Sequence, residues 1–445
     1  MTKILGISAF YHDSAVTLID NGAILNAVQE ERFTRIKHDY SFPVNSIKFI
    51  LKKNKIQLQE IDYITFYEKP IIKFDRILET NIYYSPEGYK SFLSSMPLWI
   101  KDKLFQKNLI LRELKKIDKN FDQNKLLFSE HHFSHAASAF YASSFEKAII
   151  LTIDGVGEWS TTTLSIGDKN KIEILKEINF PNSLGLLYSS FTQYLGFKVN
   201  SAEYKVMGLA PYGKPVYKDL IIKNLIDIKN DGSFRLNQDY FDYCKNLSMI
   251  NNKFEKLFGV KKRLSEDEPL SKFHTDIAAS IQSVLNEVVL KIVSYAKEKY
   301  GIANLAMSGG VALNCVTNAE ILKSNIFSKV WVQPASGDAG CSLGAALATY
   351  YDYLNNKRTV SKVDLMQGCY LGIDFTDEEV EEELKNCDAV YERLKFDDLC
   401  KYVSLEISKG KIIGWFQGKS EFGPRALGNR SILADPRNKL MQKNL

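Results

Sequence analysis

The sequence of 445 residues has few cysteines and no long uninterrupted apolar run. Its six cysteines are scattered and form no C-x-x-C pair, which excludes a disulfide framework and indicates reduced thiols. No apolar run reaches the length that crosses a bilayer, and the first residues, MTKILGISAF, indicate a strand rather than a signal peptide. We therefore expect a cytoplasmic protein with no membrane partner.

A large charge excess of either sign is missing as well. The chain has 58 Lys and Arg against 53 Asp and Glu, a formal net charge of +5. Many basic residues gather in 101–125, where Ile110, Leu114, Ile117 and Phe121 recur at helical spacing. This pattern indicates the solvated face of an amphipathic helix rather than a nucleic-acid-binding stripe. We expect no nucleic-acid partner.

The composition is that of an ordinary globular α/β protein, and one strand pattern occurs in it twice. Three apolar runs separated by polar turns open the chain, and three similar runs follow near its middle, with Thr17-Leu18 and Thr163-Leu164 in equivalent places. The runs are 3–9, 14–19 and 23–28, then 148–153, 161–166 and 172–175. The repetition predicts one α/β unit used twice, and a chance likeness of two hairpins is the alternative.

Glycine-rich turns come directly after three apolar strand runs. They are Asp154-Gly155-Val156-Gly157, Ser308-Gly309-Gly310 and Ser336-Gly337-Asp338-Ala339-Gly340. Glycine lets backbone N–H groups approach a phosphate closely, and a following helix N-terminus adds a favourable dipole. No turn matches the P-loop or the G-x-G-x-x-G fingerprint. Each alone is most often only a turn, but together they favour a nucleotide cleft between two lobes, in which Asp154 or Asp338 would face phosphate through a metal.

Three of the six histidines fall in one short segment, His131-His132-Phe133-Ser134-His135. On a helix, positions 131 and 135 lie one turn apart on the same face, so both imidazoles can reach one cation such as Zn or Fe(II). A complete site needs a third ligand from elsewhere, and a carboxylate would make a set of two histidines and one acid. A helix start with incidentally clustered histidines is the alternative.

The corner of the first hairpin carries His12 and Asp13, which could form an acid–base pair. The charged stretch 30–39, which includes Lys37, either belongs to the same site or forms a solvated surface.

A glycine-rich segment near the end of the sequence carries Lys419, Arg425 and Arg430. Arginines on such a segment suit a phosphate or carboxylate oxyanion, and structural ion pairing is the alternative. Before it we predict a helix over 267–300, a polar linker over 355–362, a helix over 396–408 and a strand over 412–416.

Together these motifs resemble those of the NodU/CmcH family of O-carbamoyltransferases. The matching segments keep the family's order and span nearly the whole chain, so the resemblance is far more specific than any one motif. They are ILGISAFYHDSA (4–15), QEERFTRIKHD (29–39), EHHFSHAASAF (130–140), TIDGVGE (152–158), EYKVMGLAPYG (203–213), MSGGVALN (307–314), PASGDAGCSLG (334–344) and GWFQGKSEFGPRALGNRSILADP (414–436).

The resemblance implies a two-part α/β enzyme. Residues 1–360 would be a duplicated actin-like (ASKHA, ribonuclease H-like) carbamoyl-transfer domain with lobes of about 1–145 and 146–360. Residues 365–445 would be an incomplete YrdC-like α/β module that activates carbamoyl phosphate with ATP to carbamoyl-adenylate. A hydroxyl of a sugar or other small acceptor would then attack the carbamoyl carbon.

The resemblance also implies roles for single residues. A metal, Fe or Zn, would sit on His131, His135 and Asp338, and Mg would accompany ATP. The hydroxyl of the sugar-like acceptor would give its proton to one catalytic group among His12, Asp13 and Lys37, and His12 is the first candidate. Nucleotide-binding residues would be Asp154, Gly155, Gly157, Lys205, Gly309, Gly310 and Asn314, and those for carbamoyl phosphate would be Lys419, Arg425 and Arg430.

Only nine residues follow Pro436, so we expect the activating module to be incomplete by comparison with the family. We expect an intact transfer domain, and a separate chain could supply the remaining C-terminal part. The alternative functions are a sugar kinase or ATPase of the same fold and a non-catalytic or half-active truncated form. The H-x-x-x-H pair and the arginine-rich segment argue against a kinase, which needs neither.

Overall fold

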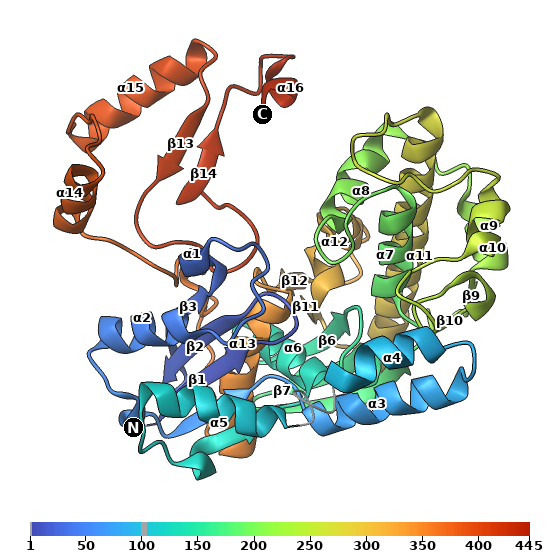
Figure 1. The fold of residues 1–445 in the computed structure, drawn as a ribbon, viewed down its shortest axis with the longest axis horizontal. Helices are drawn as coiled ribbons and strands as arrows, with labels where there is room; N and C mark the ends of the chain where they lie inside the picture. Colours follow the sequence, from blue (N-terminus) through green and yellow to red (C-terminus); the bar gives the residue numbers. More distant parts are fainter. Residues whose placement is uncertain (1, 99–104) are drawn as a thin grey trace.

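The computed structural model describes residues 2–98 and 105–445 and contains two five-stranded mixed sheets (Figure 1). The first sheet has the order β3 (Ala23–Gln29), β2 (Ala15–Asp20), β1 (Lys3–Ser8), β4 (Tyr63–Phe66) and β5 (Leu126–Phe128). The second has the order β8 (Lys171–Asn179), β7 (Ser160–Asp168), β6 (Lys147–Ile153), β11 (Asn304–Ser308) and β12 (Lys329–Val332). In each sheet the first three strands pair antiparallel and the last two join in parallel.

The two sheets repeat each other in register as well as in order. Thr17 of β2 pairs with Gly6 of β1, and Thr163 of β7 pairs with Thr152 of β6. Three antiparallel strands followed by two parallel ones form a ribonuclease H-like unit, and two such units form an actin-like fold. The predicted fold class, a duplicated α/β unit, is confirmed.

Two helices lie between the sheets, and each covers the sheet of the other half of the chain. The helix α6 (His131–Phe140) packs on β6, β7 and β11, whereas α13 (Asp338–Ala348) packs on β1, β2 and β4. These two helices also approach each other closely at Gly344, where a Cβ would overlap the Ser134 carbonyl. Phe140 and Leu343 are fully buried in the core that the two halves share.

The first sheet has its own apolar core on the opposite side. Ile47 of α2 (Val44–Asn54) and Ile110 and Leu114 of α5 (Gln106–Ile117) are fully buried there with Ile7 of β1. The amphipathic helix predicted within 101–125 is confirmed as α5, and residues 101–104 of that stretch lie outside the described residues. The remaining helices of this half are α1 (Glu31–Thr34), α3 (Pro70–Tyr83) and α4 (Tyr89–Leu98).

A third core lies under the second sheet, where helices gather to the right in Figure 1. Phe191 of α7 and Val284 of α11 are fully buried in it. The elements on this side are α7 (Leu184–Tyr194), α8 (Glu203–Leu209), α9 (Lys218–Asn224), β9 (Ile226–Ile228), β10 (Phe234–Leu236), α10 (Asn252–Phe258), α11 (Lys272–Tyr300) and α12 (Cys315–Lys323).

The helix α11 differs from the sequence-based expectation in two ways. It begins later than residue 267, because Ser271 and His274 form a capping box at its N-terminus. It is also long and apolar enough, by length and composition alone, to cross a membrane, although polar residues interrupt its apolar ones. Because 67% of its most apolar window is buried inside the fold, it is a core helix here.

After the predicted linker, Leu371 and Phe422 are buried in the shared core, and the N–H of Ala27 in β3 donates to the Leu371 carbonyl at 3.0 Å. The helices and strands of this last part of the chain stand apart from both sheets (Figure 1, orange to red). The helices α14 (Asp377–Asn386) and α15 (Phe396–Ser408) have no buried residue. The strands β13 (Ile413–Phe416) and β14 (Arg430–Leu433) form an antiparallel ribbon, which α16 (Met441–Asn444) follows. The predicted helix over 396–408 and strand over 412–416 are confirmed.

Candidate active site

The predicted metal ligands meet between the two sheets, at the N-terminal ends of α6 and α13. His131 and His135 lie one turn apart on α6, and Asp338 is the first residue of α13. Asp154, which directly follows β6, joins them: its Oδ2 lies 2.9 Å from Nε2 of His131 and 3.3 Å from Nε2 of His135. Oδ1 of Asp338 lies 3.9 Å from both nitrogens. One ligand atom from each residue therefore lies within 4.8 Å of the others.

The chemistry of this four-residue His/Asp cluster fits a divalent cation. Burial opposes a positive charge on His131, but its hydrogen bond to Asp154 and the charge of Asp338 outweigh burial and raise its pKa to about 9. Against its own burial, the same histidines hold the pKa of Asp154 well below the usual range. Two buried carboxylates thus require positive charge at the imidazole nitrogens, which protons or one metal ion can supply.

Glu158 and Gly157 position the histidines of α6. The Glu158 carboxylate accepts hydrogen bonds from the backbone N–H of His131, at 3.0 and 3.1 Å, and from that of Lys69, at 2.7 Å. An acceptor at a helix N-terminus satisfies donors that have no partner within the helix. A Cβ at position 157 would press on the rings of His131 and His132, so Gly157, which was predicted to bind nucleotide, packs against these histidines.

The glycine turns after β6 and β11 lie against each other at Asp154. The N–H of Gly310 donates to Oδ1 of Asp154 at 3.1 Å. Gly309 has a φ of 95°, and a Cβ there would overlap the Ile153 carbonyl, so only glycine fits. Around Gly155 a Cβ would meet no heavy atom within 4 Å, which leaves room for a ligand.

The predicted catalytic residues lie across from these turns. Nδ1 of His12 lies 2.9 Å from Oδ2 of Asp13, and Nε2 of His12 lies 3.8 Å from Oδ2 of Asp338. Burial opposes a charge on His12, but Asp338 and Asp13 outweigh it and raise its pKa to about 9. Because Asp13 holds Nδ1, Nε2 is the nitrogen that faces the His/Asp cluster. Nζ of Lys37 lies 5.7 Å from the ring centre of Tyr204.

One cavity of about 500 Å³ brings most of these groups together. Its walls come from turns of both sheets, so it lies in the cleft between the two units. The predicted site residues in its walls are His12, Asp13, Lys37, Asp154, Gly155, Gly310, Asn314 and Arg425. Candidates for proton transfer, nucleotide binding and oxyanion binding therefore face one space.

Two predicted nucleotide-binding residues have structural partners. Asn314 caps α12 by accepting the N–H of Thr317 at 3.0 Å, and its amide also bonds to Gln282 at 2.9 Å. Lys205 forms an ion pair with Glu266 and is not among the described walls of the cavity.

The three basic residues predicted to bind carbamoyl phosphate lie in different places. Arg425 lines the cavity, whereas Lys419 and Arg430 do not belong to its described walls. The Arg430 guanidinium lies 3.4 Å above the centre of the Phe416 ring. It donates to the backbone carbonyls of Ile373, Gln417, Gly418 and Asn429. Arg430 therefore holds the segment together.

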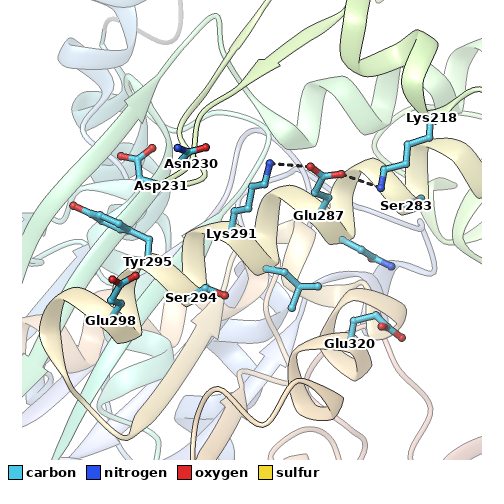
Figure 2. Close-up of a pocket in the computed structure, with 12 residues that line it drawn as sticks. Lys218, Asn230, Asp231, Ser283, Glu287, Lys291, Ser294, Tyr295, Glu298 and Glu320 are labelled. Carbon is cyan, nitrogen blue, oxygen red and sulfur yellow. Dashed lines mark ion pairs between the residues drawn. The ribbon is translucent and has the colours of Figure 1, made fainter.

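A larger groove of about 750 Å³ runs along α11 and shares no wall residue with the cavity (Figure 2). Lys218 and Lys291 flank Glu287 there, each with its Nζ 2.9 Å from a Glu287 carboxylate oxygen. Figure 2 shows these three side chains joined across the groove. Because Glu287 pairs with both lysines of this groove and none of the predicted site residues is among its described walls, we take the smaller cavity as the candidate active site.

Three further residues also reach the site: Tyr11 and Cys341, for which no role was predicted, and His38, which lies in the charged stretch 30–39 that was predicted to be either part of the site or surface. Tyr11 and His38 line the cavity, and Cys341 has its Sγ within 4.8 Å of ligand atoms of His131 and His135. Cys341 lies one helical turn after Asp338, a spacing that could have indicated it. His38 lies in the charged stretch after β3, where nothing in the local pattern separates it from a surface residue.

Two ribonuclease H-like units with a cavity between them and a His/Asp cluster beside it define a two-lobed α/β protein with a cleft between its lobes. The chain belongs to the carbamoyltransferase family: residues 3–347 match the carbamoyltransferase N-terminus, and residues 404–445 match the carbamoyltransferase C-terminus.

Relatives of this chain are longer than the chain itself. An uncharacterised protein of Synechocystis sp. is 53% identical over 99% of this chain and 72% of its own length. Nodulation protein NolNO of Sinorhizobium fredii is 36% identical over 97% of this chain and 59% of its own length. The 3'-hydroxymethylcephem-O-carbamoyltransferase of Streptomyces clavuligerus is 32% identical over 29% of this chain and 23% of its own length.

Proposed function

We propose that this chain carries the transfer step of an O-carbamoyltransferase, moving a carbamoyl group from carbamoyl-adenylate to a hydroxyl of a sugar-like small acceptor. The observation that carries the proposal is the single cavity that holds the His12–Asp13 pair, the Asp154 and Gly310 turns and the adjoining His/Asp cluster. Family membership supports carbamoyl transfer, and one relative's name specifies an O-linked product.

The proposed chemistry needs one proton acceptor at the hydroxyl. The acceptor oxygen bonds to the carbamoyl carbon, and the bond from that carbon to the adenylate phosphate oxygen breaks, so AMP leaves. The hydroxyl proton goes to Nε2 of His12, because Asp13 accepts a hydrogen bond from Nδ1–H and so leaves Nε2 as the basic nitrogen. The open surroundings of Gly155 give the adenylate space, and the Gly310 N–H fixes Asp154 beside that space by donating to its carboxylate.

His131, His135 and Asp338 would hold a divalent ion, Fe or Zn, with Asp154 as a fourth donor. Such an ion, when bound, would polarise the carbamoyl oxygen and take up the charge of Asp338, which otherwise raises the pKa of His12.

Formation of carbamoyl-adenylate from carbamoyl phosphate and ATP with Mg belongs to the C-terminal segment in this proposal. Among the basic residues predicted for carbamoyl phosphate, Arg425 lines the cavity. It is therefore our first candidate for binding the phosphate oxygens of carbamoyl phosphate. The chain spans 59% of the length of nodulation protein NolNO, and the proposal assigns no further residue to this step.

Two parallel assays test the proposal. Metal-loaded protein receives ATP and carbamoyl phosphate in one, with pyrophosphate as the readout, and synthetic carbamoyl-adenylate with a panel of monosaccharides and amino sugars in the other. We expect carbamoylated sugar and AMP in the second assay. AMP release no faster than in buffer, with no carbamoylated product, would overturn transfer, and pyrophosphate in the first assay would assign activation to this chain as well.

A further inference from the structure

Three contacts between residues in the walls of the cavity join the two lobes. Nδ2 of Asn200 donates to the hydroxyl of Tyr11 at 3.3 Å, and Lys37 lies over Tyr204. The third is a contact of 3.2 Å between Nε2 of His38 and Oγ of Ser201. In each pair one residue follows a strand of the first sheet, and the other lies at or next to the start of α8.

His38 differs from the other bridging residues because it also contacts Asp13, the hydrogen-bond partner of His12, which is the proposed proton acceptor. Nδ1 of His38 lies 2.8 Å from Oδ1 of Asp13, whose Oδ2 lies 2.9 Å from Nδ1 of His12. Asp13 therefore accepts a hydrogen bond from each imidazole. When Nδ1–H of His38 donates to Asp13, Nε2 can accept a hydrogen bond from the Ser201 hydroxyl. One unbroken chain of hydrogen bonds thus runs from Ser201 to His12.

The backbone holds this chain in place on the first-lobe side. His38 and Asp13 both have positive φ, 57° and 52°, a conformation that non-glycine residues keep only when their surroundings enforce it. The N–H of His38 donates to Glu31 at 2.9 Å, and the N–H of Ser14 donates to the Asp39 carbonyl at 2.8 Å. The His38 imidazole is therefore fixed relative to Asp13.

Ser201 belongs to the second lobe, on the side that packs around the core under the second sheet. Its neighbour Ala202 is buried, and Glu203 ties the loop to α7 by accepting hydrogen bonds from Asn200 N–H at 2.9 Å and from the Ser189 hydroxyl at 2.8 Å. Val206 on α8 is fully buried in the core of the second sheet, whereas the sheet that carries Asp13 has a different core. The His38–Ser201 contact can therefore form only when the lobes stand at this separation.

We propose that His38 is a positioning residue that couples closure of the cleft to the orientation of His12. In the closed cleft Ser201 fixes Nε2 of His38, Nδ1 of His38 fixes Asp13, and Asp13 holds His12 with Nε2 toward the reacting groups. In an open cleft the Ser201 end is lost, so the His12 ring is held by Asp13 alone. This inference rests on the proposed transfer function, in which His12 accepts the proton.

Two substitutions at position 38 separate the two hydrogen bonds. The amide of His38→Asn reaches the place of Nδ1 and can keep Asp13 but not Ser201, whereas that of His38→Gln reaches the place of Nε2 and can keep Ser201 but not Asp13. With carbamoyl-adenylate and a sugar acceptor, we expect kcat to fall about tenfold or more in both, with KM for either substrate changed less than about threefold. Ser201→Ala should lower kcat to the same extent as His38→Asn. The double variant with both substitutions should have the same kcat as His38→Asn alone.

Controls keep the coupling separate from folding and from the proposed function. His274→Gln makes the same substitution at a helix cap outside the cavity walls, and metal content and thermal unfolding report the fold of every variant. Wild-type kcat in His38→Asn, in His38→Gln or in Ser201→Ala would overturn the coupling. Absence of transfer by the wild-type protein would instead overturn the proposed function.

Discussion

At the scale of single residues, the His/Asp cluster brings together side chains that lie far apart in the sequence. Its members come from a strand end and two helix starts, and the Ser308 hydroxyl contacts Nδ1 of His135 at 3.3 Å, which turns Nε2 toward Asp154. Removal of one ligand should therefore weaken metal binding without loss of the sheets.

We predict that His135→Ala lowers the affinity for Zn or Fe(II) by about tenfold or more. Elemental analysis after equilibration with the ion measures it, and a chelator should lower the melting temperature of the wild-type protein but not that of the variant. His274→Gln is the matched control. Equal metal content in His135→Ala and wild type would refute the ligand assignment.

A second prediction at this scale concerns the turn at Gly309. Gly309→Ala should destabilise the fold by about 3 kcal/mol, because a positive φ is combined with an overlap on the Ile153 carbonyl. Gly259→Ala also changes a glycine of positive φ, but in open space, and should cost about 1 kcal/mol. Urea unfolding measures both. Equal losses would show that overlap with Ile153 does not constrain the turn.

At the scale of elements, one buried arginine ties the predicted linker to the end of α6. The Arg358 guanidinium donates to the carbonyls of Phe140, Ser143 and Phe145, each at 2.8 Å. Arg358→Lys keeps the charge but loses the planar fork, so we expect a loss of about 2 kcal/mol in unfolding free energy. Arg393→Lys, at an exposed ion pair, should change stability by less than about 0.5 kcal/mol. Equal changes of unfolding free energy in Arg358→Lys and Arg393→Lys would mean that the planar guanidinium of Arg358 is not needed for stability.

The loop between β13 and β14 is organised around the buried carboxylate of Glu421. Burial alone would raise the pKa of Glu421, but hydrogen bonds from the N–H groups of Leu427, Asn429 and Arg430 outweigh it and lower the pKa. A lowered pKa means stabilisation above the unfolded-state value of about 4.3, lost as pH falls through the folded-state value.

We therefore predict that Glu421→Gln lowers the melting temperature at pH 7, and that the difference from wild type shrinks as pH falls below about 4. Thermal unfolding monitored by circular dichroism across this range measures it, with exposed Glu382→Gln as the control. A difference that stays constant with pH would contradict the role of the charged carboxylate.

At the scale of the whole molecule, the duplicated unit could be predicted because hairpins and strand–turn signals are local. The same is true of α15, α5 and the H-x-x-x-H pair, whose spacing alone puts both imidazoles on one face. The exchange of α6 and α13 between the sheets could not be predicted in this way, since it depends on contacts between residues far apart in the chain. Arg358 looked like part of a polar linker for the same reason, and nothing local links His38 to Ser201.

At this scale, we propose that the cleft between the lobes transfers a carbamoyl group with His12 as the proton acceptor. The most direct test is the single-turnover rate of AMP release from carbamoyl-adenylate in the presence of the sugar panel, measured for metal-loaded wild type and His12→Ala. For the wild type, we predict that AMP and carbamoylated sugar form at the same rate. For His12→Ala at equal metal content, we predict that this rate is lower by a factor of about 100 or more. Equal rates in the two proteins, or no carbamoylated product from the wild type, would contradict the account.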